Sequence, residues 1–73
     1  MRIFETPEQK MEKLYRLREE LDNLDIDKNR YRVAQLILMN MMESVTNHQT
    51  FHMPESILEV VSCADEYIKF NRL

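Results

Sequence analysis

Apolar residues recur every three or four positions in the first third of the chain, while the positions between them are mostly charged. The members of this series are Met11, Leu14, Leu17, Leu21 and Leu24. This spacing matches the period of an α-helix and places the apolar side chains in one stripe. The last third of the chain has a similar stripe, made of Ile57, Val60, Val61, Ala64, Tyr67 and Ile68. Both segments are therefore predicted to be amphipathic helices.

The middle segment differs because its apolar residues are consecutive. In the stretch QLILMNMMESV, from Gln35 to Val45, six apolar residues precede Glu43, and only Asn40 interrupts them. On a helix these residues would point almost all the way round the axis. The pattern predicts a central helix that packs against both of the amphipathic ones.

Local signals set the expected ends of these helices. Thr6 followed by Pro7 and, three residues after the threonine, Gln9 is typical of a capping box with proline at the first helical position. Asp27 can cap the second helix, and Pro54 can open the third. The expected helices span about residues 7–24, 28–46 and 54–71. Asn47 is the expected left-handed residue after the second helix.

Three helices with short connections predict an all-α fold, a three-helix antiparallel bundle formed by a single small domain over residues 1–73. The absence of glycine argues against tight β-hairpins. Ile3 and Phe4, before the first cap, are expected to fold back onto the bundle.

The two other helices of the chain are not enough to cover all of the apolar surface of the central helix. A helix flanked by two others still leaves about a third of its circumference open. The third helix also has a second, weaker stripe of Leu58, Cys63 and Phe70. We therefore expect a second copy of the chain, forming a homodimer, or another protein to cover the surplus. The expected partner-binding residues are the apolar anchors Leu38, Met39, Met41, Met42 and Phe70, with Arg30 and Arg32 at the rim.

Composition limits the partners. The net charge of -3 disfavours a protein that neutralises phosphates, so nucleic acid is not an expected partner. The apolar run is shorter than the ~20 residues of a membrane span, and the N-terminus has no apolar core typical of a signal peptide. The single cysteine, Cys63, excludes an internal disulfide and favours a reducing compartment. These features predict a cytoplasmic protein that acts on neither nucleic acid nor membranes.

Candidate chemistry in the sequence is sparse. His48 and His52 are four residues apart and could form a metal site with Cys63, but they precede a proline in an expected loop. Cys63 is followed by Asp65 and Glu66, whose negative charges oppose formation of the thiolate. We expect no metal, no cofactor and no catalytic residue.

Two stretches, LYRLREELDN (residues 14–23) and ADEYIKFN (residues 64–71), resemble the two helices of the small bacterial aspartyl-phosphate phosphatases that act on sporulation response regulators. The resemblance implies phosphatase activity that would be lost on changing Asp65 or Ser62, with no change in assembly. The family has a serine four residues before this aspartate, where this chain has Val61, and Ser62 is out of register. The family also joins its two helices by a short loop, where this chain has a whole additional helix.

The leading hypothesis from the sequence is a small non-enzymatic interaction module, a regulator, adaptor or inhibitor of bacterial or phage type that self-associates. The alternative is a small accessory enzyme of the aspartyl-phosphate phosphatase type. A third hypothesis, an RNA-binding bundle, would need a basic face that includes Arg16 and Arg18, and the neighbouring acids Glu19 and Glu20 disfavour it.

Overall fold

The computed structural model describes residues 5–71, so the expected position of Ile3 and Phe4 lies outside the described residues. Three helices make up the fold: α1 (Pro7–Asp22), α2 (Lys28–Thr46) and α3 (Ile57–Phe70). This confirms the all-α, three-helix prediction. None of these helices, within the described part of the chain, is long and apolar enough to cross a membrane.

The start of α1 has the predicted capping box. The backbone N–H of Gln9 donates to the Thr6 hydroxyl at 3.2 Å, and the backbone N–H of Thr6 donates to the Gln9 side chain at 2.9 Å. Pro7 occupies the first helical position, where a missing N–H costs nothing. These contacts satisfy backbone groups that a helix start leaves open, so the boundary follows from local sequence alone.

The end of α2 differs from the prediction in the identity of its left-handed residue. Asn47 has φ -91°, whereas the next residue, His48, has φ 57°. The N–H of His48 donates to the Val45 carbonyl at 3.2 Å, and the N–H of Gln49 donates to the Ser44 carbonyl at 2.9 Å. These two bonds form a Schellman motif, which requires its left-handed residue one position later than we expected.

α3 begins three residues later than predicted. Pro54 is buried and lies in a segment without regular secondary structure, Ser56 is the N-cap, and Ile57 is the first helical residue. The backbone N–H of Glu55 donates to the Glu59 carboxylate at 3.0 Å, which supports the turn into the helix. Proline therefore serves here as an apolar packing residue before the helix rather than as its first member.

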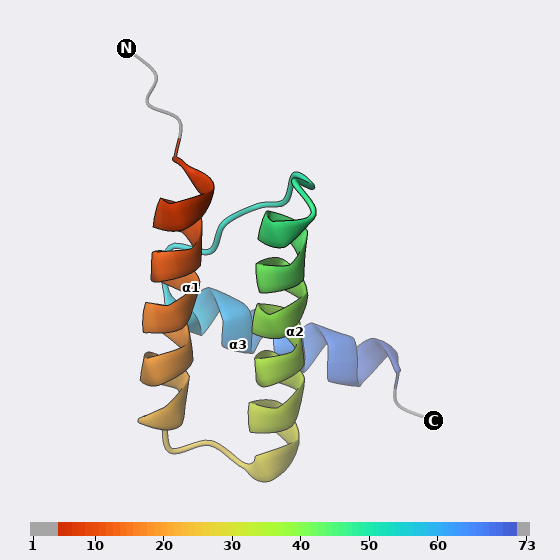
Figure 1. Cartoon of the computed structure of the whole chain (residues 1–73). Coiled ribbons are helices and arrows are strands. Elements are labelled where there is room, and N and C mark those ends of the chain that lie inside the picture. The colour runs from red at the N-terminus through yellow and green to blue at the C-terminus, as the bar shows by residue number, and fades with distance from the viewer. Residues whose placement is uncertain (1–4, 72–73) are drawn as a thin grey trace.

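α2 is the central helix, as predicted. It packs against both α1 and α3, which contact each other much less. α1 and α2 lie side by side and antiparallel, joined by the turn over residues 23–27 (Figure 1). α3 crosses behind both helices instead of running alongside them (Figure 1). The fold is thus a helical hairpin with a third helix laid across one face, and only its first two helices have the expected antiparallel arrangement.

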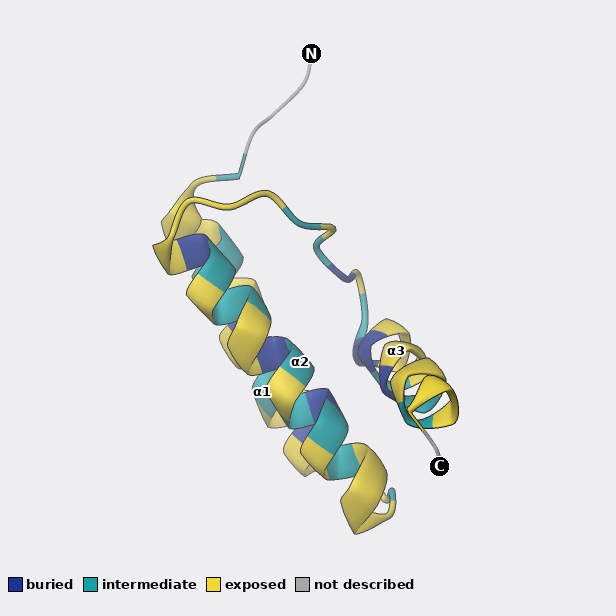
Figure 2. Ribbon diagram, turned by 90° about the vertical axis from the view of Figure 1, so that its right-hand side faces the viewer, coloured by how far each residue is buried: buried dark blue, intermediate teal, exposed yellow. Residues whose placement is uncertain are grey.

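The hydrophobic core lies between the hairpin and α3. Buried residues of α3 line the side turned toward α1 and α2, and its exposed residues lie on the outside (Figure 2). The buried core residues are Leu14, Leu17, Leu21, Ala34, Leu38, Val45, Ile57, Val60 and Ala64. All of them are apolar, and burying them supplies the main driving force for folding.

Candidate interaction surface

The side of α2 that faces away from the core carries a row of four exposed residues, which we call the α2 outer face: Arg32, Leu36, Met39 and Glu43. Their spacing of four, three and four positions places them on one side of a helix. Leu36 and Met39 each keep 52% of their surface exposed at the centre of the row. Two large apolar side chains therefore lie in solvent between two opposite charges.

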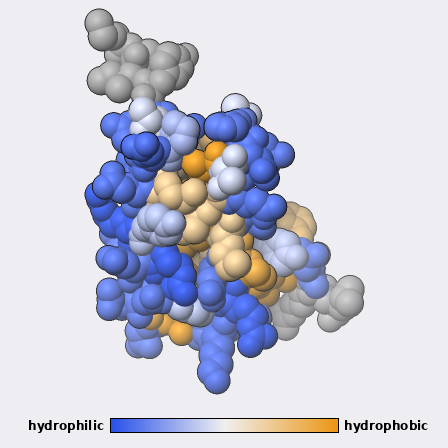
Figure 3. All heavy atoms as spheres, in the orientation of Figure 1, coloured by the Kyte–Doolittle hydropathy of each residue, from blue (hydrophilic) through white to orange (hydrophobic). Residues whose placement is uncertain are grey.

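The surface around α2 is apolar over a wider area. Hydrophobic atoms gather between α1 and α2 on the face turned away from α3, with hydrophilic atoms around them (Figure 3). Tyr15 of α1 is also more than half exposed. An exposed apolar patch with a polar border is typical of a protein contact surface.

Leu38 was predicted as a partner-binding anchor, but it does not lie on the exposed surface of α2. Its side chain is completely buried, with 0% of its surface exposed, in the core that α2 shares with α1 and α3. It is adjacent to Met39 in sequence, but one residue turns a helix by about 100°, so the two side chains point in different directions. We therefore assign Leu38 to the core.

The other predicted anchors differ in accessibility. Met41 and Met42 are half-buried and pack against the core, so each offers only part of its side chain. Phe70, at the end of α3, is 83% exposed. Leu58 and Tyr67 are also exposed on α3. The surplus apolar surface expected from the sequence is therefore present, and Met39 and Phe70 are its most accessible predicted members.

The two predicted rim arginines have different surroundings. The Arg30 Nε lies 2.9 Å from the Asp65 carboxylate and 3.5 Å from the Asp27 carboxylate. The contact with Asp65 connects α2 to α3 within the chain. Arg32 is exposed and has no ion-pair partner among residues 5–71. Arg32 is therefore the more available of the two for an outside partner.

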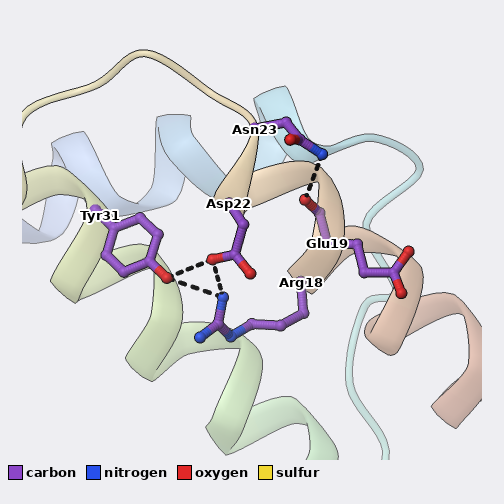
Figure 4. Close-up of polar contacts among 5 residues, drawn as sticks. All are labelled: Arg18, Glu19, Asp22, Asn23 and Tyr31. Carbon is purple, nitrogen blue, oxygen red and sulfur yellow. Dashed lines mark hydrogen bonds and ion pairs between the residues drawn. The ribbon is translucent and has the colours of Figure 1, made fainter.

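A polar network connects α1 and α2 near the turn. The Tyr31 hydroxyl and the Arg18 guanidinium both donate to the Asp22 carboxylate, and Arg18 also donates to the Tyr31 oxygen at 3.0 Å (Figure 4). The hydrogen bonds from Tyr31 and Arg18 lower the pKa of Asp22 below its usual value. The Asn23 amide donates to the Glu19 carbonyl at 3.1 Å beside it. These polar groups bond to one another within the chain, which indicates a structural role.

A groove of about 740 Å³ lies between α1 and the start of α3. Leu17, Leu24 and Ile57 contribute apolar side chains to it, and Lys13 and Arg16 contribute charge. The Lys13 ammonium is already paired with Glu5 at 2.7 Å. The lining also contains the Ser56 hydroxyl and the carboxylates of Glu20 and Glu55, so the groove combines apolar and charged side chains.

The candidate chemical residues lie apart or are exposed. His48 is part of the turn after α2, and the side chain of His52 is 87% exposed, 4.0 Å from the Glu59 carboxylate. Within residues 5–71 no three His, Cys, Asp or Glu side chains gather as a metal site. Cys63 is exposed. Asp65, central to the phosphatase alternative, pairs with Arg30, and that alternative stays a prediction.

Leu36 is an exposed residue that the apolar pattern alone did not separate from its neighbours. The sequence prediction took Leu36 to Met39 as a single apolar run, although the charged residues around the run indicate which members face outward. Arg32 and Glu43 lie on the same helical face as Leu36 and Met39. Charged residues that share a helical face with two apolar ones were the sequence signal that could have shown that Leu36 faces outward.

Comparison of the chain with protein-family models, with curated proteins and with solved structures found no match. Function is therefore inferred from the geometry of the described residues.

Proposed function

We propose that this protein is a small non-enzymatic interaction module, a regulator, adaptor or inhibitor, that self-associates and binds protein partners through the surface of α2 and the exposed end of α3. The observation that carries the proposal is the exposure of Leu36 and Met39 beside a fully buried Leu38. The core is complete without the two exposed residues. Their burial is therefore left for an interface.

The chemistry of the surface supports this role. Methionine has a flexible, polarisable side chain that adapts to different partner shapes, and surfaces that bind other proteins often use it. Met39 and the half-buried Met42 supply such side chains on α2. Phe70 adds an exposed aromatic side chain, of the kind enriched at protein interfaces. We place the protein in the cytoplasm because its single cysteine is exposed, a state that a reducing compartment preserves.

The test is the solution mass, measured by light scattering behind a sizing column over a hundredfold range of protein concentration. We expect the mass to exceed that of one chain, and we expect Met39→Glu to return it to one chain. A carboxylate at this position would be buried without a partner in the interface, which is costly. Met39 is a sharper target than Met42, because Met42 also packs on the core.

Leu58→Glu is the matched control, since Leu58 is also a large exposed apolar residue but lies on α3 beside the groove. It should leave the mass unchanged. Circular dichroism should show the same helix content in both variants. A wild-type mass of one chain at every concentration would count against self-association, and equal effects of the two variants would count against the surface of α2.

A further inference from the structure

We propose that the α2 outer face binds the same face of a second copy of this chain, with the two α2 helices antiparallel. This inference rests on the proposed function. It adds that the partner is a second copy of the chain, and it gives the register in which the two α2 helices pair. The order of residues along the face is positive, apolar, apolar, negative: Arg32, Leu36, Met39 and Glu43. Reversing the direction of one copy exchanges the two ends of this order, so the face is complementary to itself.

The register follows directly from the spacing. When two such faces meet in antiparallel order, Arg32 lies opposite Glu43 of the second copy, and Leu36 lies opposite Met39 of the second copy. The two-fold axis then passes between Ile37 and Leu38, and every contact occurs twice. This is the isologous arrangement of a two-fold dimer, in which one patch serves both partners.

The charges at the two ends of the face are available for such contacts. Arg32 and Glu43 are eleven residues apart on one helix, about 16 Å along its axis, so they cannot form an ion pair with each other. Neither has an ion-pair partner among residues 5–71. Both are exposed, and they border the two exposed apolar residues. Antiparallel pairing gives each charge an opposite partner while covering Leu36 and Met39.

A parallel pair would place like charges together at both ends, which is unfavourable. An unrelated protein has no reason to require opposite charges at equal distances from the centre of the face. The symmetry of charge and apolar positions therefore identifies a second copy as the occupant.

Charge reversal tests the register. Arg32→Glu alone places carboxylates opposite each other at both ends, and Glu43→Arg alone does the same with guanidinium groups. We expect each single variant to self-associate about tenfold more weakly than the wild type, because two attractive pairs become repulsive. The double variant restores both pairs and should regain wild-type association. An equimolar mixture of the two single variants should form a mixed pair, because each supplies the charges that the other lacks.

Glu12→Arg and Arg16→Glu are the matched controls, since both alter exposed charges on α1 by the same amount. They should not change the dissociation constant. High salt should reduce the difference between the single variants and the wild type. Dissociation constants come from light scattering or sedimentation, and circular dichroism confirms that each variant is folded.

The outcomes separate this inference from the proposed function. If the wild type associates and Met39→Glu separates it, but the double variant binds no better than the single ones, the antiparallel register is wrong and the interaction role stands. Single variants that match the wild type would overturn the register as well. A wild type that stays a single chain overturns both the register and self-association.

Discussion

Asp22 on the last turn of α1 has contacts that favour its ionised form. The hydroxyl of Tyr31 and the guanidinium of Arg18 both donate to it, and these bonds lower the pKa of its carboxyl below the ordinary value. A carboxylate whose pKa is lower in the folded state stabilises the fold above the unfolded pKa of about 4. That contribution is lost as the pH falls through the folded pKa.

Asp22→Asn should therefore lower the thermal midpoint slightly at pH 7, and the difference from the wild type should shrink toward pH 2. The effect is small because Asp22 is exposed. Thermal melts followed by circular dichroism at both pH values measure it. Asp25→Asn is the control, since no ion pair within residues 5–71 involves the Asp25 carboxylate. An Asp22→Asn difference of the same size at both pH values would contradict a role for the ionised carboxylate.

The sequence alone could not decide which of the neighbours Leu38 and Met39 lies in the core and which lies on the surface. The apolar run from Leu36 to Met39 covers nearly the whole helix, so its hydrophobic pattern has no clear inner side. The direction of the core depends on where α1 and α3 lie. Surplus apolar surface could be predicted from composition and helix number, but the choice between core and contact residue needed the packed structure.

The left-handed residue at the end of α2 affects the stability of the fold. His48 has φ 57°, a left-handed conformation that costs a residue with a Cβ about 1 kcal/mol and suits glycine. His48→Gly should raise the free energy of unfolding by roughly 0.5 to 1 kcal/mol, after allowing for the greater freedom of glycine in the unfolded chain. Urea unfolding measures this change.

Asn47→Gly provides the comparison, because Asn47 has φ -91° and gains nothing from glycine. It should leave stability unchanged or lower it. Stabilisation by Asn47→Gly rather than by His48→Gly would mean that the left-handed residue is the one first expected from the sequence.

The ends of the helices were predictable to different degrees. The capping box at Thr6 involves only residues three positions apart, so local sequence determined the start of α1. Pro54 is equally visible in the sequence, yet its buried ring belongs to the tertiary structure, and α3 starts at Ile57 instead. A signal that acts through distant packing does not reveal its role in the sequence alone.

The arrangement of the whole molecule was the least predictable part of the fold. The period of the apolar stripe shows which side of α3 faces the core, but it does not state the direction in which the helix crosses its neighbours. Residues 49–56 connect the end of α2 to α3, which crosses the hairpin, and the Arg30–Asp65 ion pair joins α3 to α2. As a result α3 covers one face of the hairpin and leaves the opposite face open, where Figure 3 shows apolar surface.

This open face leads to a prediction about the stability of the whole molecule. A chain of 73 residues buries a modest share of its surface and gains much from association. If the folded chain pairs and the unfolded chain does not, mass action makes the thermal midpoint depend on concentration. The wild-type midpoint should rise by several degrees over a hundredfold increase in concentration. Once pairing is saturated, this increase stabilises each pair against unfolding by about 2.7 kcal/mol.

Met39→Glu supplies the comparison for this experiment, since its midpoint should stay constant over the same range. Differential scanning calorimetry measures both proteins. A wild-type midpoint that is as independent of concentration as that of Met39→Glu would mean that pairing adds nothing to the stability of the fold. In that case the buried core residues alone would hold the described part of the chain together, and the apolar face of the hairpin would be open in the free protein.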